Sequence, residues 1–520
     1  MCSNVHIVSR MIAALVALLL IPVTIIYCLK NAYKRPKNFP PGPPSLPLYG
    51  AYWIILAHSF NNLAEAFRKV GERYKTKIIG CTLGPVRSVV INDPELIKEM
   101  LNREDFDGRN DIILFRLRSF WKKLGIFFTD GYFWHVQRRF SLRYLRDYGF
   151  GRRDDVLEAA MEHEIKEMMD MRLTGPKYPI EKEMVNGDLV YLPEFFTVPF
   201  VNGMVHVFTR SALPREQYKD LWSLARGTLM FQRSSNDIGG ALSLTPWLKD
   251  ILPNYSGYNG LSKGNQYLLT FFKKLIKDAI DTHDSTYNRH FLDLYLTKMN
   301  EEMSEKERTT YSVDQLILTC TDYMFPAATA VQIVLTMLVE RLLVQPEIQE
   351  KIHEEIDRVV GKDRFPNLDD RQNMPYIEAC IRETMRHDTI VPLGVPHRTM
   401  KDTTIGGYDI PENTMVNGNL TMLHMDKAIW GDPENFRPER FIKDGRFDPA
   451  SDKSLPFGAG RRLCAGETYA RQSMFQVFAG FMQTFKVSTA DGEPLLKPSK
   501  RIQGIITTIP EFWVRITPRT

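Results

Sequence analysis

The chain has 520 residues, enough for two or three average domains or for one large fold. Hydrophobic residues make up 44% and charged residues 25%, as in a globular protein with a sizeable core. The net charge of +5 is too small to indicate a nucleic-acid partner, but it is compatible with an acidic protein or an anionic membrane surface.

The N-terminal segment is uncharged from residue 11 to residue 29, about the length that crosses a bilayer as a helix. A cleaved signal peptide is the alternative, but its apolar run is usually shorter and ends at a small-residue cleavage site. More basic residues follow the segment than precede it, which places the body in the cytosol. We therefore expect a membrane anchor over residues 1–35, followed by a stiff, proline-rich hinge over residues 36–50.

The body, residues 51–520, shows no repeats and is predicted to be mainly α with a small β portion, an α+β fold. Short β-branched runs at 77–80 and 87–93 predict strands. Glycine and proline within residues 403–417 predict hairpins. Residues 346–361 carry apolar side chains at helical spacing, between a proline and a glycine, and predict a helix.

The six cysteines are scattered, and none forms a C-x-x-C pair. This distribution argues against a structural zinc site. In a chain of this length it indicates reduced thiols in a cytosol-facing compartment rather than a disulfide framework.

One cysteine, Cys464, lies in the stretch FGAGRRLCAG at residues 457–466. This stretch resembles the haem-thiolate signature of the cytochrome P450 family, Phe-x-x-Gly-x-Arg-x-Cys-x-Gly, at every fixed position. The resemblance implies haem b as cofactor, with Cys464 as the axial iron ligand, and one large haem domain of the cytochrome P450 fold over residues 51–520. The alternative is a buried structural cysteine.

The resemblance also implies the haem contacts. WHVQR at 134–138 matches the family's Trp-x-x-x-Arg, with both side chains on one helix face, whereas WSLAR at 222–226 matches the same pattern. Basic residues elsewhere are expected to bind the haem propionates, although each could be an ordinary surface base. The expected contacts are Trp134, Arg138, His397, Arg462, Arg109, Phe457 and Ala327.

The family's Glu-x-x-Arg pair is similar to Glu383 and Arg386, and Arg440 in PERF is the implied third member. A carboxylate buried between two guanidiniums locks a fold, so we expect a structural trio and not a catalytic one. Two other pairs share the spacing, and the first is expected on a solvated helix face. They are Glu355 with Arg358 and Glu434 with Arg437.

The helix expected to cross the distal haem face, residues 319–343, departs from the family pattern. The family's acid position is Thr329 and its threonine position is Ala330, while Pro326 is expected to kink the helix. Asp322 lies two turns back, about 10 Å along the axis, too far for direct replacement.

Three interpretations of this departure stay open. Thr329 could anchor a proton-carrying water chain together with freed backbone carbonyls, or the substrate's own hydroxyl could supply the protons. Alternatively, the enzyme does not cleave O₂ in this way and rearranges or dehydrates peroxides, as some members of the family do. The alternative is that Thr329 only bonds its own backbone.

Two surfaces are less specific. The arginines of residues 138–153, together with Arg461, could form a basic face for an acidic reductase or only a solvated helix face. Apolar residues in the expected pocket loops imply a lipophilic substrate, although such residues are often plain core. They include Ile112, Phe115, Phe120, Phe127, Phe231 and Leu393.

These features predict a cytochrome P450 monooxygenase that inserts one oxygen atom from O₂ into a lipid, sterol, terpenoid or xenobiotic. The resemblance implies electrons from NADPH through NADPH–cytochrome P450 reductase, with cytochrome b5 as a further candidate partner. The anchor implies the endoplasmic reticulum membrane, with the catalytic domain facing the cytosol. The alternatives are an isomerase or dehydratase that acts on peroxides without a reductase, and a haem-binding protein without turnover.

Overall fold

The computed structural model describes residues 35–235, 240–305, 307–493 and 495–519, with residues 16, 18, 20–24, 26, 27 and 30 of the preceding segment. The expected anchor, residues 11–29, therefore lies largely outside the described residues.

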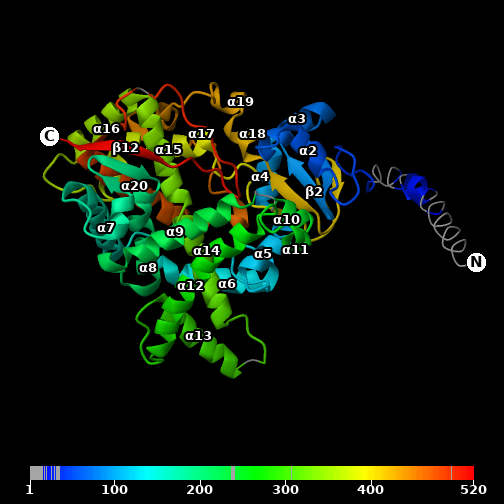
Figure 1. Cartoon of the computed structure of the whole chain (residues 1–520), viewed down its shortest axis with the longest axis horizontal. Coiled ribbons are helices and arrows are strands. Elements are labelled where there is room, and N and C mark those ends of the chain that lie inside the picture. Colours follow the sequence, from blue (N-terminus) through cyan, green and yellow to red (C-terminus); the bar gives the residue numbers. More distant parts are fainter. Residues whose placement is uncertain are drawn as a thin grey trace, which may run out of the picture.

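Helices make up most of the body, which confirms the prediction of a mainly α fold with a small β portion (Figure 1). The first part of the chain contains α2 (Tyr52–His58), α3 (Leu63–Tyr74), α4 (Pro94–Asn102), α5 (Ile113–Arg118), α6 (Gly131–Arg146), α7 (Asp155–Leu173), α8 (Thr197–Thr209), α9 (Tyr218–Arg233), α10 (Gly240–Leu244) and α11 (Leu248–Ile251). The second part contains α12 (Tyr258–Asp281), α13 (Phe291–Glu305), α14 (Val313–Ala327), α15 (Ala330–Val344), α16 (Pro346–Val359), α17 (Pro375–Asp388), α18 (Leu420–His424), α19 (Lys427–Trp430) and α20 (Glu467–Thr484).

The strands form small sheets at separate places. One sheet has the order β1-β2-β8-β5, and another has the order β11-β12-β4-β3. The first contains β1 (Ile78–Leu83), β2 (Val86–Ile91), β5 (His397–Arg398) and β8 (Met415–Gly418). The second contains β3 (Val185–Asn186), β4 (Leu189–Leu192), β11 (Phe485–Thr489) and β12 (Phe512–Pro518). Two hairpins contain β6 (Thr403–Ile405), β7 (Tyr408–Ile410), β9 (Ile442–Lys443) and β10 (Arg446–Phe447).

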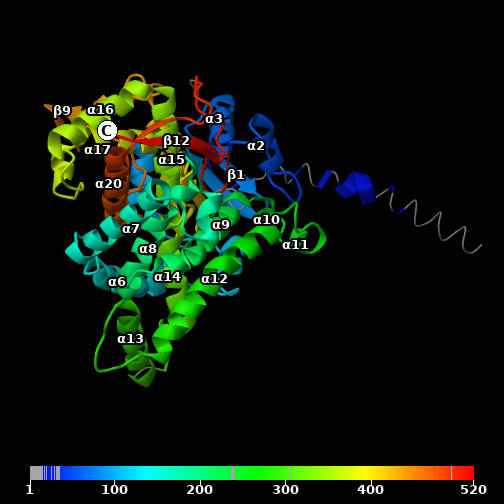
Figure 2. The same cartoon turned by 60° about the vertical axis from the view of Figure 1, so that its left-hand side comes forward.

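The two larger sheets lie on opposite sides of a helical centre. In Figure 1 the β1–β2 sheet lies with α2 and α3 on the side where the N-terminal segment leaves the body, and β12 lies on the other side. In Figure 1, α14 and α15 lie between these two sheets, and α13 projects from one end in both views (Figures 1 and 2). The parallel pairing of β2 with β8 joins residues far apart in sequence and brings β5, which carries His397, beside them.

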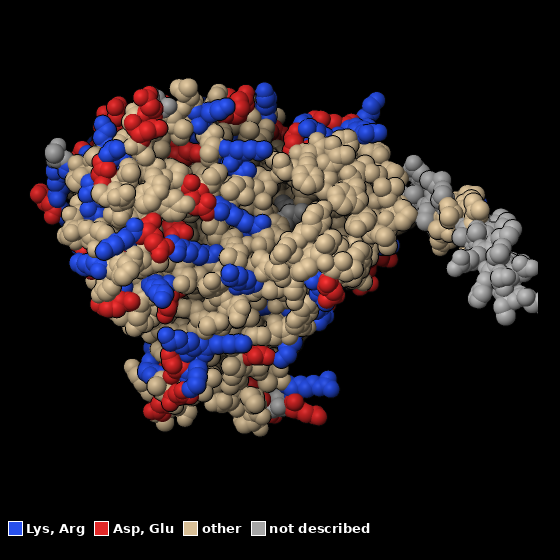
Figure 3. Space-filling model, viewed as in Figure 1, with Lys and Arg blue, Asp and Glu red and all other residues tan. Residues whose placement is uncertain are grey.

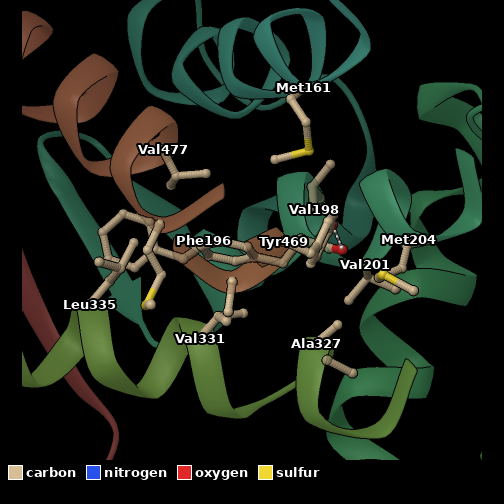
Figure 4. Close-up of a cluster of buried hydrophobic side chains, with 14 of the residues drawn as sticks. Met161, Phe196, Val198, Val201, Met204, Ala327, Val331, Leu335, Tyr469 and Val477 are labelled. Atoms are coloured by element: carbon tan, nitrogen blue, oxygen red, sulfur yellow. Dashed lines mark hydrogen bonds between the residues drawn. The ribbon is translucent and has the colours of Figure 1, made fainter. Parts of the chain in front are cut away.

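The centre of the body is the helix pair α14 and α15. Together they span residues 313–344, which have the length and hydropathy of a membrane span but are almost entirely buried inside the body. A helix that is apolar all round is a core helix when other helices cover it. Figure 4 shows Ala327, Val331 and Leu335 from this pair packed against Tyr469 of α20 and Val198 of α8.

The expected single helix over residues 319–343 is two helices instead. The first ends at Ala327 and the second begins at Ala330, and a non-helical link joins them in Figure 4. Pro326 has no N–H, so the carbonyl of Asp322 loses its helical donor. Thr329, with φ −144°, then leaves the helical conformation altogether. The kink that we expected at the proline is therefore a complete break.

The proline-rich hinge packs on the body rather than hanging free. The guanidinium of Arg35 donates to the carbonyls of Pro40 at 2.8 Å, Pro43 at 2.7 Å and Gly80 at 3.1 Å. A Cβ on Gly80 would lie 2.4 Å from the Pro40 carbonyl oxygen, so only glycine permits this contact. The hinge therefore holds a fixed position on β1.

Candidate functional site

Cys464 lies on a tight loop directly before α20. Its backbone N–H donates to the carbonyl of Phe457 at 2.9 Å, and this bond closes the loop. The loop turns at Gly460, whose φ is +67° and whose Cβ would lie 2.1 Å from the Leu101 carbonyl oxygen. Glycine is therefore required at this position by both conformation and space. The result is a thiol held on the wall of a large internal cavity.

The Cys464 thiol is accessible, but it faces the cavity. Burial raises the pKa of the thiol, while the backbone N–H of Gly466 and the charge of Arg138 lower it. The N-terminus of α20 follows at Glu467 and adds a partial positive charge nearby. These groups favour a thiolate once a metal ion compensates its burial.

Four basic side chains gather at the edge of the same cavity, which Arg109, Arg138, His397 and Arg462 all line. Their partners are mainly backbone carbonyls: Arg109 donates to Phe127, and Arg462 donates to Asp107 at 2.9 Å. Within the described part of the chain, none of the three arginines forms an ion pair with a carboxylate closer than 4 Å. The group is therefore a largely buried positive cluster whose charge nearby Asp107 and Asp130 compensate only in part.

The electrostatics of this cluster indicate an anion site. Burial, reinforced by its neighbour Arg109, lowers the pKa of Arg462 to about 8, and burial lowers the pKa of Arg109 to about 10. A guanidinium keeps its proton in proteins, so the lowered pKa values mean that the nearby carboxylates Asp107 and Asp130 do not fully compensate the charges. The two propionates of haem would supply the missing compensation.

His397 is held in one tautomer. Burial and the nearby Arg109 lower its pKa well below the usual range, so the ring is neutral. Its Nδ1 lies 2.7 Å from the Phe106 carbonyl oxygen and must donate to it. Nε2 is then free to interact at the cavity, and it becomes a donor to a carboxylate only when the ring is protonated.

The indole N–H of Trp134 also lacks a hydrogen-bond acceptor among the described residues, although it is buried. Arg462 stacks on its ring with 3.7 Å between the guanidinium carbon and the ring centroid, and Arg138 lies at 5.7 Å. A carboxylate at the cluster would satisfy this N–H as well.

The competing WSLAR segment lies elsewhere. Trp222 donates to the Glu194 carbonyl at 3.0 Å, and Arg226 pairs with the Glu194 carboxylate. Neither residue lines the cavity. The geometry thus separates the two matches that the pattern alone left equal.

The rest of the cavity wall is apolar. Ala327 and Ala330 contribute small side chains from the broken distal helix, and Phe457 lies on the cysteine loop. Of the six apolar residues named from the sequence, Phe115, Phe127 and Phe231 line the cavity, whereas Ile112, Phe120 and Leu393 do not. Further apolar lining residues are Leu114, Phe128, Phe325, Val331, Val334, Val391, Ile505 and Ile506.

Thr329 does not belong to this wall. Its side chain is fully buried, and its hydroxyl donates to the Phe325 carbonyl at 3.2 Å. Thr329 is therefore bonded to its own backbone, as in the alternative interpretation of the sequence. The geometry gives no support to the predicted role of Thr329 as a proton relay, because the break turns it away from the cavity.

Asp322 does line the cavity, but it is fully engaged elsewhere. Its Oδ2 accepts from the backbone N–H groups of Ile126 at 2.6 Å and Phe127 at 2.9 Å, and its Oδ1 lies 2.5 Å from Arg118 Nη2. A Cβ on Gly125, with φ +85°, would lie 2.3 Å from Asp322 Oδ2. This carboxylate therefore fixes the loop before α6 in place.

Few features of the sequence indicate the polar residues of the cavity wall. The sequence pattern points to Asp322 on the distal helix, but it does not point to Arg118 or Gln232, which also line the cavity. The residues beside them in the sequence do not distinguish them, and only the fold brings them to one cavity.

The Glu383 trio lies away from the cavity and holds the loops that precede the cysteine. Glu383 pairs with Arg386 at 2.7 Å and Arg440 at 3.0 Å, and all three side chains are buried. Arg386 also donates to the carbonyls of His424 and Pro433. The contacts link α17 to the segment after α19.

One prediction about the other Glu-x-x-Arg pairs was wrong. Glu355, expected on a solvated face, is only 6% exposed and accepts from the backbone N–H groups of Tyr376 and Ile377. It caps the first turn of α17, where orphan N–H groups attract a carboxylate. Arg358 is 4.0 Å away and exposed.

A thiol on a glycine-turned loop and a group of basic side chains line one largely apolar cavity, an arrangement suited to a haem-thiolate centre. The comparisons agree, and the chain belongs to the cytochrome P450 family, whose model, "Cytochrome P450", matches residues 40–515.

Similar proteins extend over most of the chain. The "Farnesoate epoxidase" of Bombyx mori is 31% identical over 97% of this chain and 99% of its own length. "Cytochrome P450 2E1" of Oryctolagus cuniculus is 32% identical over 89% of this chain and 88% of its own length. The human "Cytochrome P450 2J2" is 30% identical over the same shares. The predicted family and enzyme class are thereby confirmed: the chain is a cytochrome P450 monooxygenase.

Proposed function

We propose that the chain is a membrane-anchored monooxygenase that inserts one oxygen atom from O₂ into a lipophilic small molecule, with electrons from NADPH through a reductase. The single observation that carries this proposal is the cavity itself. It places one thiol, a buried basic cluster and a predominantly apolar wall around a common space. These are the needs of a haem-thiolate centre and of a lipophilic substrate.

Each group of residues has its own part. Cys464 would be the axial ligand, and bound haem would supply the activation of O₂. Arg109, Arg138 and Arg462 would hold the propionates, with the Trp134 N–H as a further donor. His397 would join them once a bound propionate protonates its ring. Phe457 would lie beside the haem on the cysteine side, and Ala327 beside it on the distal side, where a small side chain leaves room.

The distal side would deliver protons without an acid–alcohol pair. Because Pro326 removes one backbone donor, the Asp322 carbonyl is free to hold a water molecule. A water chain on such carbonyls, or a hydroxyl of the substrate, would carry the protons that O–O cleavage needs. Thr329 stays the weakest candidate for this role.

Electrons would arrive on the cysteine side. Arg139 and Arg143 are exposed on α6, the helix that carries Arg138 and borders the Cys464 loop. Arg461, by contrast, pairs with Glu104 and Asp107. A negatively charged NADPH–cytochrome P450 reductase would dock on the exposed arginines, and cytochrome b5 could use the same charge complementarity.

The membrane would lie against the side where the N-terminal segment leaves. Residues 1–35 would anchor the chain in the endoplasmic reticulum, and the haem domain, residues 51–520, would face the cytosol. Figure 3 shows few charged side chains on the face over α2, α10 and α11. Exposed apolar residues on these elements and the neighbouring loops include Leu48, Trp53, Phe60, Trp247, Ile251 and Tyr255.

The proposed substrate class takes into account the similar protein "Farnesoate epoxidase" of Bombyx mori. An unsaturated isoprenoid would suit the aromatic wall, where Phe115 stacks on Phe128 with 3.5 Å between ring centroids. Epoxidation of a double bond would be the reaction of this kind.

A peroxide isomerase or dehydratase is the second candidate, because Thr329 and Ala330 replace the acid–alcohol pair. Two incubations of the purified enzyme separate the monooxygenase from the peroxide isomerase or dehydratase. In the first arm the enzyme receives a lipophile extract with NADPH, O₂ and reductase. In the second arm it receives organic hydroperoxides alone. Mass gains of one oxygen in the first arm only support the monooxygenase. Turnover in the second arm only would contradict it.

A further inference from the structure

Polar side chains interrupt the apolar cavity wall, and two of them are Arg118 of α5 and Gln232 of α9. Both side chains line the cavity, and the residues are 3% and 1% exposed. They meet the same aromatic cluster: the Arg118 guanidinium lies 5.8 Å from the Phe325 ring centroid, and Phe231, next to Gln232, packs edge-on against that ring at 5.4 Å.

Arg118 has one nitrogen left over. Its Nη2 lies 2.5 Å from Asp322 Oδ1, and its guanidinium lies 5.3 Å from the Phe128 ring centroid. Its Nη1 is buried and has no hydrogen-bond partner among the described residues. An unmet donor of a charged group in a buried place costs more than an ordinary hydrogen bond gains.

Gln232 is held by its backbone while its side chain is unsatisfied. Its carbonyl accepts from Ile505 N–H at 2.8 Å, and a Cβ on Gly504 would lie 2.4 Å from that carbonyl oxygen. The Oε1 atom is buried without a partner in the described part of the chain. A primary amide can donate or accept, so it can adapt to the group that Arg118 selects.

The charge of Arg118 is already compensated. Asp322 faces it with a side chain 0% exposed, and its second oxygen is held by two backbone N–H groups. A carboxylate from a ligand would place two anions around one cation and leave a net buried charge. A neutral oxygen would accept from Nη1 without that cost.

We propose that Arg118 and Gln232 form a polar anchor that binds a neutral oxygen of the substrate, a hydroxyl or carbonyl oxygen, in preference to a carboxylate. The inference rests on the proposed monooxygenase function and specifies its substrate class as a neutral oxygenated lipophile. The anchor fixes one end of the molecule under α5, while the aromatic wall holds the chain.

The proposed anchor is tested without turnover by measuring how tightly ligands bind to the ferric holoenzyme. The shift of the Soret band reports the binding. Two series serve as probes: farnesene, farnesol, methyl farnesoate and farnesoate, and dodecane, dodecanol, methyl dodecanoate and dodecanoate. The alcohol or ester should bind about tenfold more tightly than the hydrocarbon and than the acid. Equal binding of all members in both series, tightest binding of the acids, or no binding in either series would overturn the anchor.

Matched variants assign the effect to the two side chains. Gln232→Leu and the charge-neutral double variant Arg118→Met/Asp322→Asn should lose the preference for the oxygenated members and keep the affinity for the hydrocarbon. Asp322→Asn alone leaves Arg118 uncompensated and should shift the preference toward the acids. Arg116→Gln, on the exposed face of the same helix and paired with Asp111, is the control.

The outcomes separate this proposal from the proposed function. Turnover with NADPH, O₂ and reductase that persists while every variant binds as the parent does would overturn the anchor alone. A water molecule that occupies the anchor in all cases would give the same equal affinities and counts against it.

Discussion

The cysteine side and the distal side of the cavity differ in how closely they follow the family. On the cysteine side, the loop around Cys464 carries every fixed residue of the signature, and Arg138 and Arg462 lie where the signature implies. On the distal side, Pro326 breaks the helix and Ala330 stands in place of the threonine. The cysteine side would have to hold a buried thiolate ligand and two haem propionates, and few combinations of residues can do so. The distal side only has to deliver protons, and protons can travel by several routes.

The largest loss of stability is expected at the buried trio of Glu383, Arg386 and Arg440, which holds the segments before the cysteine loop. Glu383→Gln leaves Arg386 and Arg440 buried without their shared carboxylate, at a cost of about 3–5 kcal/mol. We expect little folded, haem-containing protein on expression. Glu434→Gln, at an exposed glutamate with the same sequence spacing that pairs with Lys427, should express as the parent does. Equal haem content in both variants would contradict the structural role of Glu383.

The next effect concerns the basic cluster. Arg462→Leu removes one of the partly compensated guanidiniums together with its stacking on Trp134. Haem should be lost to apomyoglobin about tenfold faster or more, because a charged hydrogen bond is missing. Arg461→Gln, the adjacent exposed arginine, is the control. Unchanged haem retention in Arg462→Leu would remove this residue from the haem site.

A distal substitution should sharpen the contrast between the two sides. Ala330→Thr places a hydroxyl on the cavity wall at the family's threonine position. If the water route is the less efficient one, the fraction of consumed O₂ recovered as product should rise by about twofold or more. A lower or equal fraction would mean that the present route already delivers protons well.

The smallest effect is expected at Thr329. Thr329→Val keeps the shape and removes only the hydrogen bond to Phe325, worth about 1 kcal/mol of stability. Coupling of O₂ consumption to product should stay within about twofold of the parent. A large loss of coupling would restore Thr329 as a relay and contradict its position behind the cavity wall.

Most of the residues that the sequence indicates for the cysteine side line one cavity, because short motifs with fixed spacing specify local loops and helix faces. Spatial choices needed the fold: it separates Trp134 from Trp222 and turns Glu355 inward as a helix cap. Arg118 and Gln232 could not be predicted, since Arg118 shares its segment with several other basic residues and Gln232 lies between Phe231 and Arg233. Only tertiary contacts bring them to one cavity. Pro326 alone predicts a kink, whereas the structure shows a complete break of the helix at Thr329.

The central claim is that Cys464 is the thiolate ligand of the haem. The absorption spectrum of the reduced, CO-bound protein tests it most directly, with Cys464→Ala beside Cys81→Ala, whose thiol is buried away from the cavity. The account predicts the thiolate-type band in the parent and in Cys81→Ala, and its loss in Cys464→Ala. Persistence of that band in Cys464→Ala would contradict the account.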